Sequence, residues 1–199
     1  MMISNNLFSL EGKTALVTGG STGLGLMATA GLAAAGAKVF IVSRKLENCE
    51  KAANKINNCD LKGQVVPFKG DLSSEAGISN IVNELHKKNS ELHVLVNNAG
   101  RTWGSNFGSF PYDAWEKVLN LNVSALFHLT QKLVPLLAAS AERDSPTRVI
   151  NVGSVMGEVP MGDGAYSYAA SKSAVHHITK ILAKDLAEKN ITVNALSPG

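Results

Sequence analysis

Short apolar runs rich in β-branched residues alternate along the chain with longer stretches of helical character. The apolar runs predict strands at Thr14–Thr18, Lys38–Ser43, Gln64–Lys69, His93–Asn97, Arg148–Val152 and Thr192–Leu196. Most of these runs are apolar at nearly every position, whereas a strand with one face in water would alternate between apolar and polar residues. They therefore predict strands that other elements cover on both faces.

The stretches between these runs predict helices at Leu24–Ala35, Arg44–Asn57, Ser73–Asn89, Pro111–Ala139 and Tyr166–Asn190. Gly36 follows the first of them, where glycine commonly ends a helix, and Ser73-Ser74-Glu75 is typical of a helix start. Repeated strand–helix–strand units with right-handed crossovers produce a doubly wound parallel sheet flanked by helices. We therefore predict an α/β fold, formed by residues 1–199 as a single domain.

Composition excludes several classes of protein. Of the 199 residues, 45% are apolar and 18% are charged, which is too hydrophobic for a disordered chain. The net charge of +3 is small and scattered, so we expect no nucleic-acid partner. No apolar run approaches the ~18 residues of a membrane span. Cys49 and Cys59 do not indicate a disulfide scaffold and no secretory segment follows the start, so we expect a cytoplasmic protein.

His176 and His177 are the remaining candidates for a metal site. No cysteine or carboxylate lies near them at metal-ligand spacing. We therefore expect no bound metal and interpret both histidines as surface or interface residues.

A glycine-rich segment, Thr18–Gly25, lies between the first predicted strand and the first predicted helix. Glycine lets the backbone approach a ligand without a Cβ in the way, and a helix N-terminus offers free N–H groups to a pyrophosphate. The spacing is G-x-x-x-G-x-G rather than the commoner G-x-G-x-x-G. Its position after an apolar strand and before an Ala-rich helix favours dinucleotide binding, and a plain structural turn is the alternative.

The end of the second predicted strand indicates which dinucleotide binds. An acidic residue about 20 positions after the glycines commonly holds the ribose 2′-hydroxyl of NAD. Here the sequence reads Val42-Ser43-Arg44-Lys45. Serine can bond a 2′-phosphate and the arginine fork can grip one, so the sequence favours NADP(H). The alternative is that Arg44 is a solvated residue at a helix start.

Tyr168 and Lys172 are spaced to lie on one face of a helix. A phenol is a weak acid at neutral pH, and a neighbouring ammonium favours its ionised form, so the pair is a candidate general acid/base. Tyr166 is a rival, but Ala170 is the residue one turn after it. Ser154 follows an apolar strand, at the edge where open α/β sheets bind ligands, and could orient a substrate carbonyl.

These motifs, in this order, resemble the short-chain dehydrogenase/reductase family, in the branch with a T-G-x-x-x-G-x-G loop and a Y-x-x-x-K pair. The matching residues are Thr18–Gly25, Asp71-Leu72, Asn97-Asn98-Ala99-Gly100, Asn122-Val123, Ser154, Tyr168, Lys172 and Pro198-Gly199. The resemblance covers nearly the whole chain and implies a Rossmann-type fold. The serine–arginine end of the second strand resembles the NADP-preferring members.

The resemblance implies a role for each matching residue. Tyr168 would protonate the carbonyl oxygen during reduction, and Ser154 would hold that oxygen. Lys172 would bond the nicotinamide ribose. Asn122 would hold a water of a proton relay, or else be a buried polar residue bonded to the backbone. Asp71 would bond the adenine amino group, or else act as a cap near the following helix.

The catalytic set implied in this way is Asn122, Ser154, Tyr168 and Lys172. The cofactor-binding set is Gly19, Ser21, Thr22, Gly23, Leu24, Gly25, Ser43, Arg44, Asp71, Leu72, Asn98, Ala99, Gly100, Tyr168, Lys172, Pro198 and Gly199. The expected activity is the NADPH-dependent reduction of a small-molecule ketone, such as a 3-oxoacyl thioester. Met156, Val159 and Met161 favour a substrate with a hydrophobic portion. The alternatives are a polyol or sugar dehydrogenase and a non-catalytic NADP-binding protein.

Family members usually continue for several dozen residues past the Pro-Gly motif, whereas this sequence stops at Gly199. Either the sequence is a fragment of a longer reductase or the protein is naturally short. Without the last strand and the substrate loop, we expect low activity and an exposed sixth strand, and we expect a longer form to be active. The two long predicted helices, Pro111–Ala139 and Tyr166–Asn190, resemble the family's subunit interface. We accordingly expect a homodimer or homotetramer.

Overall fold

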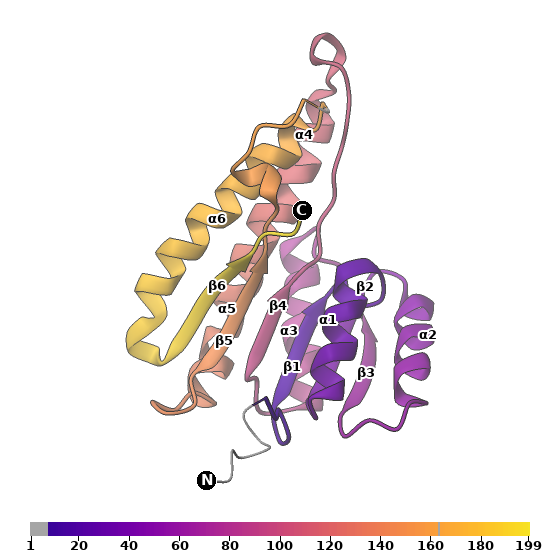
Figure 1. Cartoon of the computed structure of the whole chain (residues 1–199), viewed down its shortest axis with the longest axis vertical. Coiled ribbons are helices and arrows are strands. Elements are labelled where there is room, and N and C mark those ends of the chain that lie inside the picture. The colour runs from indigo at the N-terminus through magenta and orange to yellow at the C-terminus, as the bar shows by residue number, and fades with distance from the viewer. Residues whose placement is uncertain (1–7, 163) are drawn as a thin grey trace.

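The computed structural model describes residues 8–162 and 164–199. These residues form a six-stranded parallel sheet with the strand order β3-β2-β1-β4-β5-β6 (Figure 1). The strands are β1 Thr14–Thr18, β2 Lys38–Ser43, β3 Gln64–Lys69, β4 Val94–Asn97, β5 Thr147–Val152 and β6 Ile191–Leu196. The helices are α1 Gly23–Ala34, α2 Leu46–Asn57, α3 Glu75–Lys88, α4 Tyr112–Leu119, α5 Leu126–Ala139 and α6 Tyr166–Leu186. The predicted doubly wound parallel sheet is confirmed, because the order runs outward from β1 to β3 and from β4 to β6.

The central strand β1 shows why its sequence is apolar at nearly every position. It pairs with β2 on one side and β4 on the other, and all five of its residues are buried. Leu16 belongs to the apolar cluster formed with α3 and α5 on one face of the sheet, whereas Ala15 and Val17 belong to the cluster formed with α1 and α2 on the other. Successive residues of a strand point to opposite faces, so both sets must be apolar.

The edge strand β6 is covered less evenly. Ile191 and Val193 are buried in the cluster of the first face, whereas Thr192, Asn194 and Leu196 are exposed. Among the described residues, α1 and α2 pack over the part of the second face that β1 to β3 form (Figure 1). No helix in the described ranges is both long and apolar enough to cross a membrane.

The prediction of one helix over Pro111–Ala139 is wrong in one respect, because this segment is not a uniform α-helix. A π-helical turn, Asn120–Ala125, separates α4 from α5. Such wide turns are rare and frequently occur at functional sites. The apolar spacing continues through this turn, so the sequence pattern alone does not reveal it. The other long helix also ends earlier than predicted, at Leu186, before a short turn in which Asn190 adopts a left-handed φ of 54°.

Buried polar side chains connect the sheet to the helices of its first face. The Asn97 amide donates to Thr130 Oγ1 on α5, at 3.0 Å, and to Asn151 Oδ1 on β5, at 2.9 Å. The Asn151 amide donates in turn to Thr179 Oγ1 on α6, at 2.9 Å. Buried polar groups must be paired to avoid a desolvation cost, so this chain of bonds sets how α6 lies along the sheet.

Candidate functional site

The loop between β1 and α1 requires glycine for two separate reasons. Gly19 and Gly23 have φ of +63° and +52°, which favours glycine. A Cβ at Gly25 would lie 2.3 Å from the Gly19 carbonyl oxygen, so no side chain fits there. Thr22, which precedes α1, makes no side-chain cap bond, and the first turn of α1 contains no acidic residue. The N–H groups of that turn are therefore available to an anion.

A cavity of about 280 Å³ opens beside this loop, at the carboxyl ends of β1 to β4. It brings together many of the predicted cofactor residues, namely Gly19, Thr22, Ser43, Arg44, Asp71, Leu72, Asn98, Ala99 and Gly100. Ser21, Gly23 and Gly25 do not line it. The position agrees with the rule that open α/β sheets bind ligands where the strand order reverses, here between β1 and β4.

The charged side chains that line this cavity include Asp71, Arg44 and Arg101. The Asp71 carboxylate accepts the Ser73 N–H at 2.9 Å. That bond, with smaller contributions from the Arg44 and Arg101 charges, lowers the pKa of Asp71. Asp71 is thus an anion at neutral pH, facing two guanidinium groups. The cap of α3 is a different residue, Ser74, whose hydroxyl accepts the Gly77 N–H at 3.1 Å.

Ser43 and Arg44 differ in how freely they can bind a phosphate. The Ser43 hydroxyl donates to the Lys45 carbonyl at 3.0 Å and lies 3.1 Å from Cys49 Sγ. Arg44 is exposed and lines the cavity, and within the described residues its guanidinium makes no hydrogen bond or ion pair. Arg44 is therefore the member of the pair whose donors are available.

Asn98 connects the end of β4 to the glycine loop. Its side-chain amide donates to the carbonyls of Thr18 and Gly19, at 2.9 and 3.2 Å. The Thr18 hydroxyl accepts the backbone N–H groups of Asn98 and Ala99, each at 3.0 Å. These reciprocal bonds hold the two loops together on one side of the cavity.

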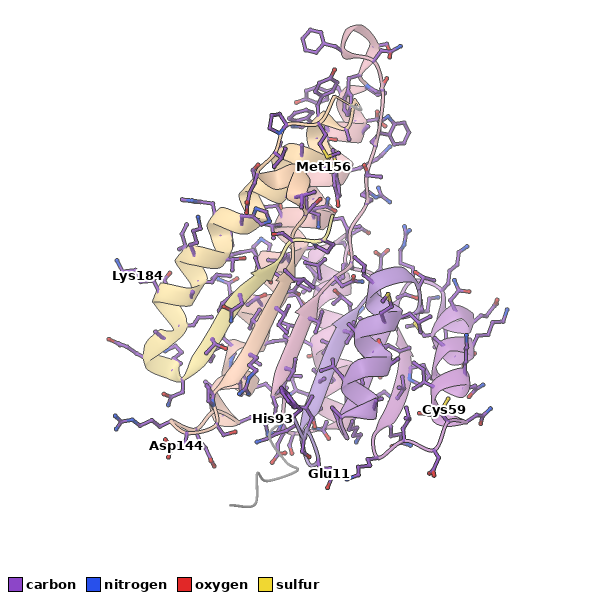
Figure 2. The ribbon with its side chains drawn as sticks, in the orientation of Figure 1. Glu11, Cys59, His93, Asp144, Met156 and Lys184 are labelled. Carbon is purple, nitrogen blue, oxygen red and sulfur yellow. The ribbon has the colours of Figure 1, made fainter. Side chains whose placement is uncertain are left out.

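A second, larger cavity of about 610 Å³ adjoins the first. Predicted residues from five separate segments line it, namely Leu24, Asn98, Gly100, Ser154, Tyr168, Lys172, Pro198 and Gly199. Met156 and Met161 also line it, whereas Val159 does not. Figure 2 shows Met156 near the upper part of α6, and His93 at the opposite end of the sheet. Residues 14 positions apart in the sequence, Ser154 and Tyr168, thus face one space.

The Tyr168–Lys172 pair has the predicted arrangement on α6. The Lys172 Nζ lies 5.4 Å from the centre of the Tyr168 ring and donates to the Val152 carbonyl of β5 at 2.6 Å. The rival Tyr166 is 41% exposed and does not line the cavity. Its ring packs edge-on against Phe107 and Phe110.

Comparison with known proteins agrees with this geometry. The short chain dehydrogenase family model matches residues 13–199. The chain belongs to the short-chain dehydrogenase/reductase family. It is 46% identical over 192 residues to the rhamnolipids biosynthesis 3-oxoacyl-[acyl-carrier-protein] reductase of Pseudomonas aeruginosa, covering 96% of this chain and 74% of that one. It is 34% identical over 195 residues to the 5-keto-D-gluconate 5-reductase of Escherichia coli, covering 98% and 74%.

Solved structures of the family have the same fold. An NADP complex of RhlG from Pseudomonas aeruginosa superposes with a TM-score of 0.91 at 46% identity, covering 96% of this chain and 74% of that one. The family assignment and the Rossmann-type fold are therefore both confirmed. Members of this family are oxidoreductases.

In this family member, the Ser154 hydroxyl donates to no partner among the described residues, so its hydrogen is available. Ser154 caps a short 3-10 turn, Val155–Gly157, and its Oγ accepts the Met156 N–H at 3.2 Å. A hydroxyl that accepts one bond through its lone pair can still donate its own hydrogen. The arrangement therefore suits donation to an oxygen in the second cavity.

Lys172 is buried, with only 5% of its surface exposed. Burial lowers its pKa from 10.5 to about 8, because desolvation disfavours the charged form. At neutral pH the side chain is still mainly an ammonium. Between about pH 8 and pH 10.5 the unfolded chain binds more protons than the folded chain, so the free energy of unfolding rises with pH across this window. Below about pH 8 both states are protonated and the full cost of the buried charge applies.

We predict that Lys172→Met removes this pH-dependent contribution. Urea unfolding at about pH 7 and about pH 10 should show that the wild type gains stability relative to the variant as pH rises. Lys180→Met, an exposed lysine on the same helix, is the matched control and should follow the wild type. Equal pH dependence in all three chains would contradict the lowered pKa.

Asn122 lies in the π-helical turn and lines neither cavity. Its Oδ1 accepts the Arg101 N–H at 2.8 Å, and its amide donates to the Arg101 carbonyl and to Ser171 Oγ, both at 2.9 Å. Both amide hydrogens are thus used, which leaves the side chain only acceptor capacity toward a water. The side chain matches the alternative stated for it, a buried polar residue bonded to the backbone.

The interpretation of His176 as a surface or interface residue is wrong. His176 is 9% exposed and its ring lies beside Ser154, whereas His177 is exposed as predicted. His176 follows Lys172 by one helical turn, so both side chains point to the same face of α6. Within the described ranges, no group of three or more His, Cys, Asp or Glu side chains could hold a metal ion.

The sequence did not predict several of the residues that line the two cavities. Lys117, Asn120 and Leu121 reach the first cavity from the α4 end, and nothing in their local sequence indicates this. Arg101 lines both cavities. Its position directly after Asn98-Ala99-Gly100 was the one available signal.

Proposed function

We propose that this chain transfers a hydride between NADP(H) and a carbonyl or secondary alcohol, and that it reduces a ketone with NADPH. The observation that carries this proposal is that the two cavities adjoin each other and share Asn98, Gly100 and Arg101 as lining residues. One long ligand can therefore extend from the Arg44 side to the Tyr168 side.

The residues of the first cavity fit NADPH. Anion donors at the start of α1, a loop in which a Cβ at Gly25 would clash, and an available guanidinium suit a pyrophosphate and a 2′-phosphate. Gly19 and Thr22 would face the pyrophosphate, Arg44 the 2′-phosphate and Asp71 the adenine. Bound NADPH supplies the hydride, and the protein supplies orientation and proton chemistry.

The second cavity then provides the proton. Tyr168 gives its phenolic proton to the carbonyl oxygen as that oxygen gains charge, and the Ser154 hydroxyl donates a hydrogen bond to the same oxygen. The Lys172 ammonium, held by the Val152 carbonyl, favours the ionised phenol that remains. Asn122 positions Arg101 and α6 through its side-chain bonds.

The substrate we propose is a 3-oxoacyl thioester. Leu24, Val155, Met156 and Met161 give the second cavity an apolar wall that suits an acyl chain. Similarity to a 3-oxoacyl-[acyl-carrier-protein] reductase supports the same class. A sugar substrate is the second candidate, because the chain is also similar to a 5-keto-D-gluconate reductase. Cytoplasmic location and oligomers formed through α4, α5 and α6 stay predictions.

A substrate panel tests the proposal. NADPH oxidation should be faster with acetoacetyl and longer 3-oxoacyl thioesters than with 5-keto-D-gluconate, by ~10-fold or more in kcat/KM, since each buried methylene adds to binding. A preference for the sugar acid would support the second candidate. Tight NADPH binding without turnover of any ketone would instead support a non-catalytic nucleotide-binding protein.

A further inference from the structure

The His176 ring fills the space between α6 and the segment that carries Ser154. A Cβ on Gly153 would lie 2.1 Å from His176 Nε2, and a Cβ on Gly157 would lie 2.8 Å from His176 Cε1. Neither distance is possible for real atoms, so the ring occupies the volume that side chains at both positions would need. The ring thus packs directly against the backbone on either side of Ser154.

The polar contacts of the ring point to the same segment. Nε2 accepts the backbone N–H of Ser154 at 3.4 Å and lies 3.0 Å from the Ser197 hydroxyl. An acceptor nitrogen carries no hydrogen, so the neutral ring must carry its hydrogen on Nδ1. Nδ1 lies 3.3 Å from Glu158 Oε1, without hydrogen-bond geometry to any acceptor among the described residues.

Ser197 lies in the segment that follows β6, and the next two residues of this segment, Pro198 and Gly199, line the larger cavity. The backbone joins the two segments directly, because Gly153 N–H donates to the Leu196 carbonyl at 2.7 Å and Val155 N–H to the Pro198 carbonyl at 3.0 Å. Ser154 and Pro198 both line the cavity. A single atom, His176 Nε2, therefore contacts the backbone of one segment and a side chain of the other.

We infer that His176 is a positioning residue, whose Nε2 holds the Ser154 and Ser197 segments together so that the Ser154 hydroxyl faces the reacting carbonyl. This inference rests on the proposed reductase function. Without the acceptor, the buried Ser154 N–H loses its partner, which costs free energy, and the segment relaxes. Catalysis depends on placement to a fraction of an ångström, so the chemical step should suffer more than cofactor binding.

Two substitutions distinguish the loss of the hydrogen-bond acceptor at Nε2 from the loss of the volume of the His176 side chain. In His176→Gln, the side-chain oxygen can take the place of Nε2, whereas His176→Met keeps an apolar side chain of similar length without a strong acceptor. We expect His176→Met to lower kcat by ~10-fold while the NADPH Kd changes by less than about threefold. His176→Gln should recover most of the loss. His177→Met, at the exposed neighbour, is the matched control and should behave as the wild type.

Nuclear magnetic resonance provides a readout that needs no turnover. The imidazole nitrogens of His176 should show the hydrogen on Nδ1, and the Ser154 amide should exchange faster in His176→Met than in the wild type or His176→Gln. A hydrogen on Nε2 would overturn the inference. So would equal losses of kcat in the Met and Gln variants, or no loss in either, measured where both are fully folded.

Tyr168→Phe distinguishes failure of this inference from failure of the proposed function. If the wild type reduces the ketone, Tyr168→Phe does not, and His176→Met retains full kcat, then the function stands and the positioning role of His176 is wrong. If no ketone is reduced while the tautomer and exchange results hold, the proposed function fails and the contact between His176 and the Ser154 segment stands.

Discussion

Tyr168→Phe is expected to lower kcat by ~10³-fold, within the range that a positioned general acid contributes. The substitution removes one oxygen and keeps the ring that lies 5.4 Å from Lys172 Nζ. Binding of NADPH should stay within about twofold of the wild type, because only the proton donor is lost. Steady-state NADPH oxidation and calorimetric NADPH titration measure the two effects separately.

Tyr166→Phe is the matched control for this prediction. It makes the same chemical change two residues earlier, on a ring that packs against Phe107 and Phe110 outside the cavity. Its kcat should equal that of the wild type. Equal losses in both variants would mean that Tyr168 is not the proton donor, and unchanged turnover in Tyr168→Phe would assign the proton to another group.

Arg44→Ala is expected to weaken NADPH binding by about 10- to 100-fold, which corresponds to the roughly 1.5–3 kcal/mol of hydrogen bonds to a charged group. NADH binding should hardly change, because NADH lacks the 2′-phosphate that Arg44 would contact. Calorimetric titration with each nucleotide, at one fixed ionic strength, gives both dissociation constants.

Lys45→Ala controls for the general loss of positive charge. Lys45 is the next residue, also a cation and also exposed, but it does not line the cavity. Its loss should weaken NADPH binding far less than the loss of Arg44. If both variants bind NADPH equally well, or if Arg44→Ala weakens NADH as much as NADPH, then Arg44 does not read the 2′-phosphate.

The strands were the most predictable part of this fold. The central strands are buried on both faces, and this demands apolar residues at consecutive positions, as in Ala15, Leu16 and Val17. The predicted strand limits agree with the structure to within one residue. The break in the helix after Leu119 was not predicted, because apolar residues such as Leu121 and Ala125 continue at helical spacing through the π-helical turn.

The candidate site likewise has features that the local sequence predicts and features that depend on tertiary packing. The glycine loop and the Tyr168–Lys172 spacing are local features, so their geometry follows from a few consecutive residues. Lys117 and Asn120 reach the first cavity only through tertiary contacts, such as the bond that the Asn120 amide donates to the Ser73 carbonyl at 2.8 Å. No short-range pattern encodes that contact.

The sequence by itself determined the strands, the loop that accepts no side chain at Gly25, and the pair of residues one helical turn apart on α6. These depend on burial periodicity and backbone sterics, which act over neighbouring residues. Only the tertiary structure decided that Arg101 borders both cavities and that His176 lies against Gly153. It also decided that the Asn122 amide donates hydrogen bonds to Arg101 and Ser171. Each of these contacts joins residues at least 20 positions apart, and their positions are set by the packing of α6 and the strands into one core.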